Sequence, residues 1–450
     1  MINDRYPPGP NYRSLCRRLL KARGDFPGLL TSLARDYGDI VHIGGATTHY
    51  YLLSHPDDIR DVLVTRGRDF VQRRGVERLV EDGMLVSAGE RHYRQRRAVS
   101  PALHGPCLDS LGSVMVECSA RARASWQDGA AVDIVQEMKR LTLAVMWKAL
   151  FDTDPGSELD KLADACTAVM EYLSPINIRL PFVLAKIPLP GNRRFKRARD
   201  HLAAVIGQKI RERRSGGANR DDLLSTLLGA QGVGDGESGT PERELRDELL
   251  TILFAGHETT TNALAWTWYL LSQHPRARAE LQAELDVVLT GRLPAVHDIE
   301  HLRYTRMVLA EAMRLYPPVW LVIRQALSDC EIGDYCVPAG SLIFISQYVV
   351  HRDPRYFSDP FRFDPQRWTP ETGDERPQFA YFPFGGGHRS CVGEHFAWME
   401  GVLVIAALAQ QWQMKLTPGR PVRLQPRITL RPAHGIRMLL ERRKSAAASR

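Results

Sequence analysis

Apolar and polar residues alternate with helical spacing over long stretches of this chain and with β spacing over a few short ones. Helical patterns run from about Asp133 to Arg214, with interruptions at Pro175, at Pro181 and in the IPLPG segment that ends at Gly191. Proline ends or kinks a helix because it lacks a backbone N–H and clashes with the preceding turn. We therefore predict several separate helices in this middle part of the chain.

A single long helix is predicted from Pro241 to His274, where Pro275 stops it. The glycine-rich residues 229–240 before it resemble a flexible connection between two helices. At about 1.5 Å per residue this helix measures on the order of 48 Å, so it must cross the body of the protein. Its middle is apolar on nearly all sides except for the cluster from Gly256 to Thr261, which places polar groups deep in the core.

Short β-prone runs alternate with glycine and proline in residues 326–348 and again in residues 427–442. Small sheets should therefore accompany a helical body, and the fold class that we predict is mainly α with small β-sheets (α+β). Length alone does not require more than one domain. We predict one domain over residues 1–450, with a disordered tail over about residues 443–450.

The composition is that of an ordinary globular protein, with 44% hydrophobic and 25% charged residues. This is enough apolar material for a deep core that could enclose a cofactor. The longest apolar run, from Val402 to Ala409, is far shorter than the roughly 18 residues that a membrane-spanning helix needs. The first residues lack the apolar core of a signal peptide. We therefore expect no membrane span and a location in the cytoplasm.

Charge and cysteine usage narrow the classes of protein further. The formal net charge is +8, but the basic residues are spread along the chain without a nucleic-acid-binding motif, so an acidic protein partner fits better than nucleic acid. Most of the basic residues are arginines, which favours a bacterial source. The seven cysteines form no CxxC pair, which argues against a disulfide framework or a zinc site. They are Cys16, Cys107, Cys118, Cys166, Cys330, Cys336 and Cys391.

The most specific motif runs from Phe384 to Gly393 and reads FGGGHRSCVG, directly before a helical run. Its glycines let backbone N–H groups approach the sulfur of Cys391, and a position just before a helix favours the thiolate form of a cysteine. A thiolate is a strong axial donor to iron. The alternatives are a buried structural cysteine beside a glycine-rich turn and a phosphate-binding loop. The latter fails because the glycine spacing fits neither the dinucleotide-binding nor the P-loop pattern.

This motif resembles the haem-ligand loop of cytochromes P-450, which reads Phe-x-x-Gly-x-Arg-x-Cys-x-Gly, and every fixed position matches. The resemblance covers nearly the whole chain, although the middle third matches only in its helical pattern. It implies the cytochrome P-450 fold, with haem b (iron protoporphyrin IX) between the long distal helix and the cysteine loop. Cys391 would be the iron ligand, and Phe384 and Ala255 would contact the haem.

Glu311 and Arg314 form an i, i+3 pair of opposite charges on one helical face. Most such pairs are solvated surface salt bridges. Here the pair resembles the family's Glu-x-x-Arg motif, whose third partner comes from a later Phe-x-Pro-x-Arg segment, present as residues Phe363 to Arg367. The resemblance implies that Glu311, Arg314 and Arg367 form a structural network on the haem side of the core and are not catalytic.

The polar cluster of the long helix resembles the family's oxygen-activating site. Glycine lowers helix stability and threonine can bond back to a carbonyl, so Gly256 and Thr259 favour a local widening or kink that leaves a groove for O2. By resemblance, Thr259 hydrogen-bonds the bound dioxygen and Glu258 helps to relay protons. A zinc-protease motif is excluded because Thr261 stands where its second histidine is needed. The alternative is a satisfied polar cluster inside a helix.

The two haem propionates need cations from several parts of the chain. His92 and Arg96 lie in a segment similar to the family's Trp-x-x-x-Arg helix, with His in place of Trp, and Arg324 and Arg389 complete the set. Taken alone, each arginine is more often a solvated charge. Five apolar residues resemble the family's pocket-lining positions, and ordinary core packing is the alternative for each. They are Leu85, Ala255, Val319, Leu321 and Ile428.

The function implied by the resemblance is the insertion of one oxygen atom from O2 into an apolar small molecule, by hydroxylation or epoxidation. A terpenoid, a fatty acid or a polyketide-like compound would suit such a site. Electrons would come from a separate ferredoxin and its reductase, because the chain ends soon after the last sheet segment without a flavin domain, and we expect a monomer. The alternatives are a peroxide-driven peroxygenase, an isomerase and a non-catalytic haem sensor. Glu258 and Thr259 favour the O2-dependent enzyme, since preformed peroxide needs neither.

Overall fold

The chain forms two compact units, and each is assembled from stretches that lie far apart in the sequence. The computed structural model describes residues 6–44, 48–72, 80, 82–173, 189–216, 222–231, 242–369, 376–419 and 421–443. Unit 1 comprises Met1–Arg74, Ala310–Cys391 and Arg423–Ala433, and unit 2 comprises Gly75–Leu309, Val392–Val422 and His434–Arg450.

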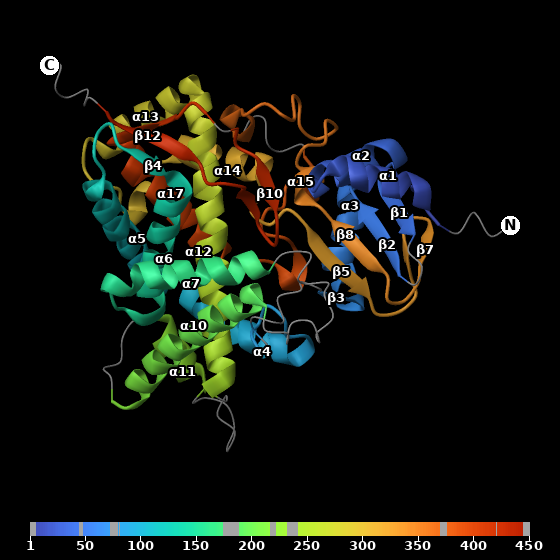
Figure 1. Cartoon of the computed structure of the whole chain (residues 1–450), viewed down its shortest axis with the longest axis horizontal. Helices are drawn as coiled ribbons and strands as arrows, with labels where there is room; N and C mark the ends of the chain where they lie inside the picture. The colour runs from blue at the N-terminus through green and yellow to red at the C-terminus, as the bar shows by residue number, and fades with distance from the viewer. Residues whose placement is uncertain are drawn as a thin grey trace. The chain divides into compact units, whose positions relative to one another are not determined.

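Unit 1 is built on a five-stranded sheet with the strand order β1-β2-β8-β5-β3 (Figure 1). β2 pairs with β8 in parallel, and the other three pairings of this sheet are antiparallel. Tyr51, Leu53, Ile343 and Ile345 of its central strands are fully buried in one apolar cluster with Phe70. The strands are β1 (Ile40–Gly44), β2 (His49–Leu53), β3 (Phe70–Gln72), β5 (Val322–Ala326) and β8 (Leu342–Ile345).

Short helices and two hairpins complete unit 1. α1 and α2 begin at side-chain caps, because Asn11 accepts the N–H of Ser14 and Asp25 accepts the N–H of Gly28. The helical elements are α1 (Tyr12–Ala22), α2 (Phe26–Tyr37), α3 (Pro56–Arg60), η2 (Asp61–Thr65), η3 (Gly67–Asp69), α15 (Gln347–Val350), η7 (Pro365–Trp368), η8 (Gln378–Ala380) and η9 (Gly387–Arg389). The hairpins are β6 (Cys330–Ile332) with β7 (Tyr335–Val337) and β10 (Leu424–Pro426) with β11 (Leu430–Pro432).

Unit 2 is a group of helices around α12 (Glu242–Gln273), the long yellow-green helix of Figure 1. α6 (Ile134–Phe151) packs along it. From Asp247 to Trp268 every residue of α12 is buried except Ala255, Gly256 and Thr259. A helix that is buried almost all round draws its stability from packing, and the three exceptions mark one open stretch in its middle.

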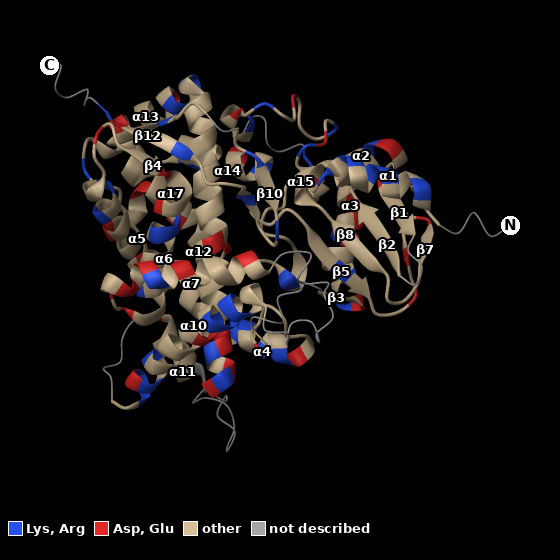
Figure 2. Ribbon diagram, viewed as in Figure 1, with Lys and Arg blue, Asp and Glu red and all other residues tan. Residues whose placement is uncertain are grey.

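The remaining helices of unit 2 surround α12 and α6, and Figure 2 shows many basic residues on one of them, α10. The helical elements are α4 (Gly89–Val99), η4 (Ser100–Leu103), α5 (Pro106–Ser125), η5 (Gly156–Glu158), α7 (Leu159–Tyr172), α10 (Pro190–Arg214), α11 (Leu223–Gln231), α13 (Pro275–Leu289), η6 (Val296–Asp298) and α17 (Glu394–Ala409). α14 (Arg303–Leu315) belongs to unit 2 as far as Leu309 and to unit 1 from Ala310. The strands β4 (Ala131–Asp133), β12 (Arg437–Arg442) and β9 (Trp412–Leu416) form a sheet in that order.

The predicted fold class, mainly α with small β-sheets, is confirmed. The long helix runs from Glu242 to Gln273, within one residue of the predicted bounds at either end. Pro175 and Pro181, most of residues 229–240 and the tail beyond residue 443 lie outside the described residues. The prediction of a single domain stays a prediction. Among the helices that the structure describes, none is long and apolar enough to cross a membrane.

Candidate active site

The loop that ends at Cys391, in unit 1, is closed by its own backbone. The N–H of Cys391 donates to the carbonyl oxygen of Phe384 at 2.9 Å, and the N–H of Ser390 donates to that of Gly387 at 3.0 Å. Cys391 itself is exposed. The residue is therefore not a buried structural cysteine.

Three glycines of this loop are required by their surroundings. Gly385 and Gly387 have φ angles of +74° and +68°, in the left-handed region that favours glycine. A Cβ on Gly387 would lie 2.0 Å from the carbonyl oxygen of Leu63, and a Cβ on Gly386 would lie 2.5 Å from the ring of Phe379. The loop thus packs directly against the backbone of η2 and against the Phe379 side chain of η8.

A buried histidine that the sequence analysis did not single out supports the same loop. Nε2 of His351 accepts the N–H of Phe382 at 3.0 Å. Burial holds the pKa of His351 well below its ordinary value, and the positive charges of Arg314 and Arg352 lower it further. The imidazole is therefore neutral and can accept this hydrogen bond, which holds the backbone two residues before Phe384.

The three residues predicted to form a structural network lie together in unit 1. Arg314 donates from Nε and Nη2 to the two carboxylate oxygens of Glu311, at 2.8 Å each, and Arg367 Nε donates to Oε1 at 3.0 Å. Trp368 Nε1 donates to Oε2 at 3.0 Å, and the N–H of Asp364 donates to Oε1 at 2.9 Å. Glu311 and Arg314 are completely buried. Burial of these charges is tolerated because their hydrogen-bonding groups are occupied.

Backbone carbonyls complete this network, and no sequence motif marks them. Arg314 Nη1 donates to the carbonyl oxygens of His351 at 2.8 Å and of Pro360 at 2.7 Å, and Nη2 donates to that of Arg362 at 3.0 Å. One guanidinium thus holds the chain at three points after α15. The contribution of Trp368 could have been suspected, because it directly follows Arg367. These contacts give the network a supporting role.

Three of the five residues predicted to line a substrate pocket lie beside one another in unit 1. Trp320 Nε1 donates to the carbonyl oxygen of Arg427 at 2.8 Å, and the N–H of Leu430 donates to that of Pro318 at 2.9 Å. These bonds hold residues 427–430 against residues 318–321. The three residues are partly exposed, and Leu321 also packs against a buried apolar cluster. They are Val319, Leu321 and Ile428.

The four cations predicted to bind propionates divide between the units. In unit 1, Arg324 is buried on β5 with 4% exposure and Arg389 is partly exposed in η9. In unit 2, His92 is buried with 3% exposure and Arg96 is partly exposed, one turn later on α4. Of the two pocket candidates in unit 2, Leu85 is partly exposed just before α4 and Ala255 lies on α12.

The open stretch of α12 presents Ala255, Gly256 and Thr259. Thr259 follows Ala255 by four residues, so the two lie one above the other on the helix, and the Thr259 hydroxyl donates to the carbonyl oxygen of Ala255 at 2.7 Å. A Cβ on Gly256 would lie 2.5 Å from the sulfur of Met146, so this glycine allows α6 to approach. α12 is α-helical through this stretch, and the expected widening is not seen as an interruption.

Glu258 occupies a different side of α12. It is 3% exposed, and its Oε1 accepts the side-chain amide of Asn262 at 2.9 Å. Cys166 on α7 lies near it: burial and the charge of Glu258 together raise the pKa of this thiol to about 12, although Lys139 on α6 lowers it. Glu258 is therefore placed among residues of α6 and α7, while the adjacent Thr259 lies on the open stretch.

Glu400 on α17 is a buried carboxyl group that the sequence analysis did not identify. It is completely buried, and neither oxygen has a well-formed hydrogen bond among the residues that the structure describes. Burial raises its pKa to about 8, although the nearby Thr260 hydroxyl of α12 acts in the opposite direction. A single carboxylate in the apolar run from Phe396 to Ala409 was the available signal.

Comparison with known proteins identifies the family. The model of the cytochrome P-450 family matches residues 7–439. Cyclooctatin synthase from Streptomyces melanosporofaciens is 38% identical over 424 residues, which cover 90% of this chain and 89% of that protein. Cyclooctat-9-en-7-ol 5-monooxygenase from the same organism is 36% identical over 389 residues, covering 85% and 84%. A retinoic acid-bound cyanobacterial CYP120A1 has 26% identity and a TM-score of 0.84, covering 98% of this chain and 100% of that one.

This chain therefore belongs to the cytochrome P-450 family, as its cysteine loop suggested, and it is a monooxygenase of that family. Membership implies a haem whose iron is bound by a cysteine thiolate. The residues present fit such a group. In unit 1, Cys391 is an exposed cysteine at the end of a tightly packed loop. In unit 2, α12 leaves an unburied stretch in an otherwise buried helix.

Proposed function

We propose that this protein hydroxylates or epoxidises an apolar, terpenoid-like small molecule, using haem b, O2 and two electrons from a separate ferredoxin-type donor. The observation that carries the proposal is the Cys391 loop, in which glycines with positive φ and close backbone packing present an exposed sulfur. When bound, the haem supplies oxygen activation at its iron. The polypeptide supplies the thiolate ligand and the cations for the propionates, and it orients the substrate.

The substrate class rests on the candidate lining residues and on the relatives. Val319, Leu321 and Ile428 of unit 1 are apolar and partly exposed, and so is Leu85 of unit 2, which suits an apolar ligand. The relatives include a pentalenene oxygenase from Streptomyces avermitilis, 32% identical over 394 residues. Its name and those of the two Streptomyces melanosporofaciens proteins favour a cyclic terpenoid over a fatty acid or a polyketide.

We assign proton supply to Thr259 and Glu258. The Thr259 hydroxyl donates its hydrogen bond to the carbonyl oxygen of Ala255. The lone pairs of its oxygen can therefore accept a hydrogen bond from a group on the open stretch of α12. Glu258 would take up protons on the side of α6 and α7. Both residues serve the reduction of O2, and a peroxide-driven enzyme would need neither.

The thiolate assignment is tested with carbon monoxide. The reduced, carbon monoxide-bound protein should show the strongly red-shifted Soret band of a thiolate-ligated haem. Cys391→Ser should lose that band, because a serine hydroxyl does not replace the thiolate donor. Cys107→Ser, at another exposed cysteine, is the matched control and should keep it. A folded, haem-containing wild-type protein without the shifted band would refute Cys391 as the ligand.

A further inference from the structure

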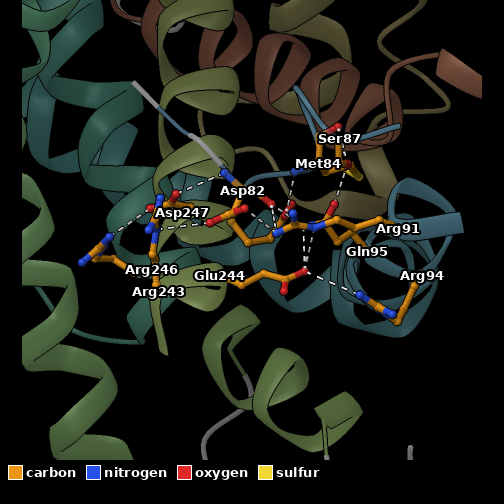
Figure 3. Close-up of polar contacts among 11 residues, drawn as sticks. Asp82, Met84, Ser87, Arg91, Arg94, Gln95, Arg243, Glu244, Arg246 and Asp247 are labelled. Carbon is orange, nitrogen blue, oxygen red and sulfur yellow. Dashed lines mark hydrogen bonds and ion pairs between the residues drawn. The ribbon is translucent and has the colours of Figure 1, made fainter. Parts of the chain in front are cut away.

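A polar cluster in unit 2 joins residues 82–87 to the first turns of α12 and to α4 (Figure 3). On the α4 side, Gln95 Nε2 donates to the carbonyl oxygen of Asp82 at 2.6 Å and to Glu244 Oε1 at 3.1 Å, and Ser87 donates to Gln95 Oε1 at 2.6 Å. Arg91 pairs with the carboxylates of Asp82 at 2.8 Å and of Glu244 at 3.4 Å. Both ends of the segment are thus tied to α4.

The first three residues of the segment are also held by α12, through their backbone. The N–H of Asp82 donates to Asp247 Oδ2 at 3.2 Å, and the N–H of Met84 donates to Glu248 Oε2 at 2.8 Å. Between these two amides, a Cβ on Gly83 would lie 2.1 Å from the hydroxyl oxygen of Thr251. The carboxylates of Asp247 and Glu248 hold this segment against the helix, and the absence of a Cβ at Gly83 allows the close approach.

The residues that hold the segment continue into the open stretch of α12. At 100° per residue, Ala255 and Thr259 each point within about 20° of the direction of Glu248, because they follow it by seven and eleven residues. Glu248 precedes Ala255 by two turns, or roughly 10 Å. The segment that contains Leu85 thus covers the face of α12 directly before its open part.

We propose that Glu248 is a positioning residue for substrate recognition, because it anchors residues 82–87 as a wall of the substrate site. This inference rests on the proposed function, since it needs a haem and a ligand beside the open stretch of α12. Glu248 is 5% exposed, and its second oxygen, Oε1, has no hydrogen-bond partner among the described residues. A carboxylate in this buried place with only one of its oxygens hydrogen-bonded is costly for packing alone, which favours a further role.

Protonation of Glu248 near neutral pH should weaken its hold on residues 82–87. Burial, together with the negative charges of Glu244 and Asp247, raises its pKa to about 7, against the lowering effect of the Met84 N–H and the Arg91 charge. Asp82 faces the same cluster. The charged carboxylate binds the Met84 N–H more strongly than the neutral acid does. The anchor therefore weakens as the pH falls below about 7.

The test compares a small and a large ligand of the haem iron. Imidazole and the bulky azole clotrimazole both bind through nitrogen and shift the Soret band, but only the bulky one reaches the walls of the site. Glu248→Gln should weaken clotrimazole binding by about tenfold, the range of a hydrogen bond to a charged group, and leave imidazole unchanged. Glu242→Gln, at an exposed ion pair on the same helix, is the control.

The pH dependence and a second variant complete the test. The ratio of clotrimazole affinities between wild type and Glu248→Gln should shrink between about pH 8 and pH 6, because the wild type loses the same charge there. Gly83→Ala should reproduce the loss, and Thr251→Ala in the same chain should restore part of it by removing the colliding oxygen. Equal effects on both azoles, or none, would overturn the positioning role. No spectral shift with imidazole in the wild type would instead contradict the haem itself.

Discussion

Among the three residues of the open stretch of α12, Thr259 has the polar side chain. Its hydroxyl donates a hydrogen bond to the carbonyl oxygen of Ala255. If it orders a proton for O2 reduction, Thr259→Ala should keep electron consumption while product per electron pair falls, and hydrogen peroxide should accumulate. General acid assistance is worth on the order of a hundredfold. Thr259→Ser, which retains the hydroxyl, should restore coupling. Full coupling in Thr259→Ala would leave Thr259 only a helix-packing residue.

Glu400 predicts a pH dependence of stability. Its pKa is about 8 in the folded chain and near 4.5 when exposed, so between these values the folded state holds a proton that the unfolded state releases. The free energy of unfolding should therefore decrease as the pH rises, by roughly 1.4 kcal/mol per pH unit at most. Guanidine unfolding of the holoprotein at pH 6 and pH 8 measures this decrease. Glu400→Gln should remove it, and Glu394→Gln on the same helix should not.

At the scale of the element, the three glycines around Cys391 form a graded series. Gly387→Ala combines a positive φ with a collision at the Leu63 carbonyl, Gly385→Ala has only the positive φ, and Gly393 has neither. Alanine in the left-handed region costs about 1 kcal/mol. The melting temperature of the holoprotein should fall most for Gly387→Ala, less for Gly385→Ala and hardly at all for Gly393→Ala. A different order would mean that backbone geometry does not govern the stability of this loop.

Elements defined by local signals were predictable, and contacts between distant segments were not. The bounds of α12 follow from Pro241, Pro275 and the apolar pattern between them, and the structure differs by one residue at each end. The support of the cysteine loop by His351 had no comparable signal, because its partner is a backbone amide 31 residues away. The anchoring of residues 82–84 by α12 depends on backbone amides in the same way.

At the scale of the whole molecule, the net charge of +8 favours an acidic electron donor. Arg97 on α4 is exposed and follows Arg96, a proposed propionate ligand. The rate of electron transfer from an acidic ferredoxin should fall as salt is raised, since exposed charges are screened within about 10 Å at 0.1 M. Arg97→Gln should weaken that salt dependence, while Arg276→Gln on α13 should not. A rate indifferent to salt would indicate an apolar docking surface or no such donor.

Sequence motifs predict the residues that serve the haem and O2, but they do not predict the residues that line the substrate pocket. The family motifs name Cys391, Thr259 and the Glu311 network, because fixed chemistry requires fixed residue types there. The pocket residues carry no such requirement, since any apolar side chain of suitable size can line a wall. Substrate identity therefore has to come from binding experiments.

The assembly of unit 1 from distant stretches of the sequence has a consequence for folding during translation. β2 pairs with β8, in which Leu342 is the partner of Tyr50. β8 is therefore translated about 290 residues after β2. At roughly 5–20 residues per second, the nascent β1–β2 hairpin waits for about fifteen seconds to a minute before its neighbour emerges. During that interval the edge of β2 that will pair with β8 is an unpaired strand edge, which can bind other nascent chains. Successful synthesis of this protein therefore depends on keeping its first 74 residues from aggregating until the last third of the chain arrives.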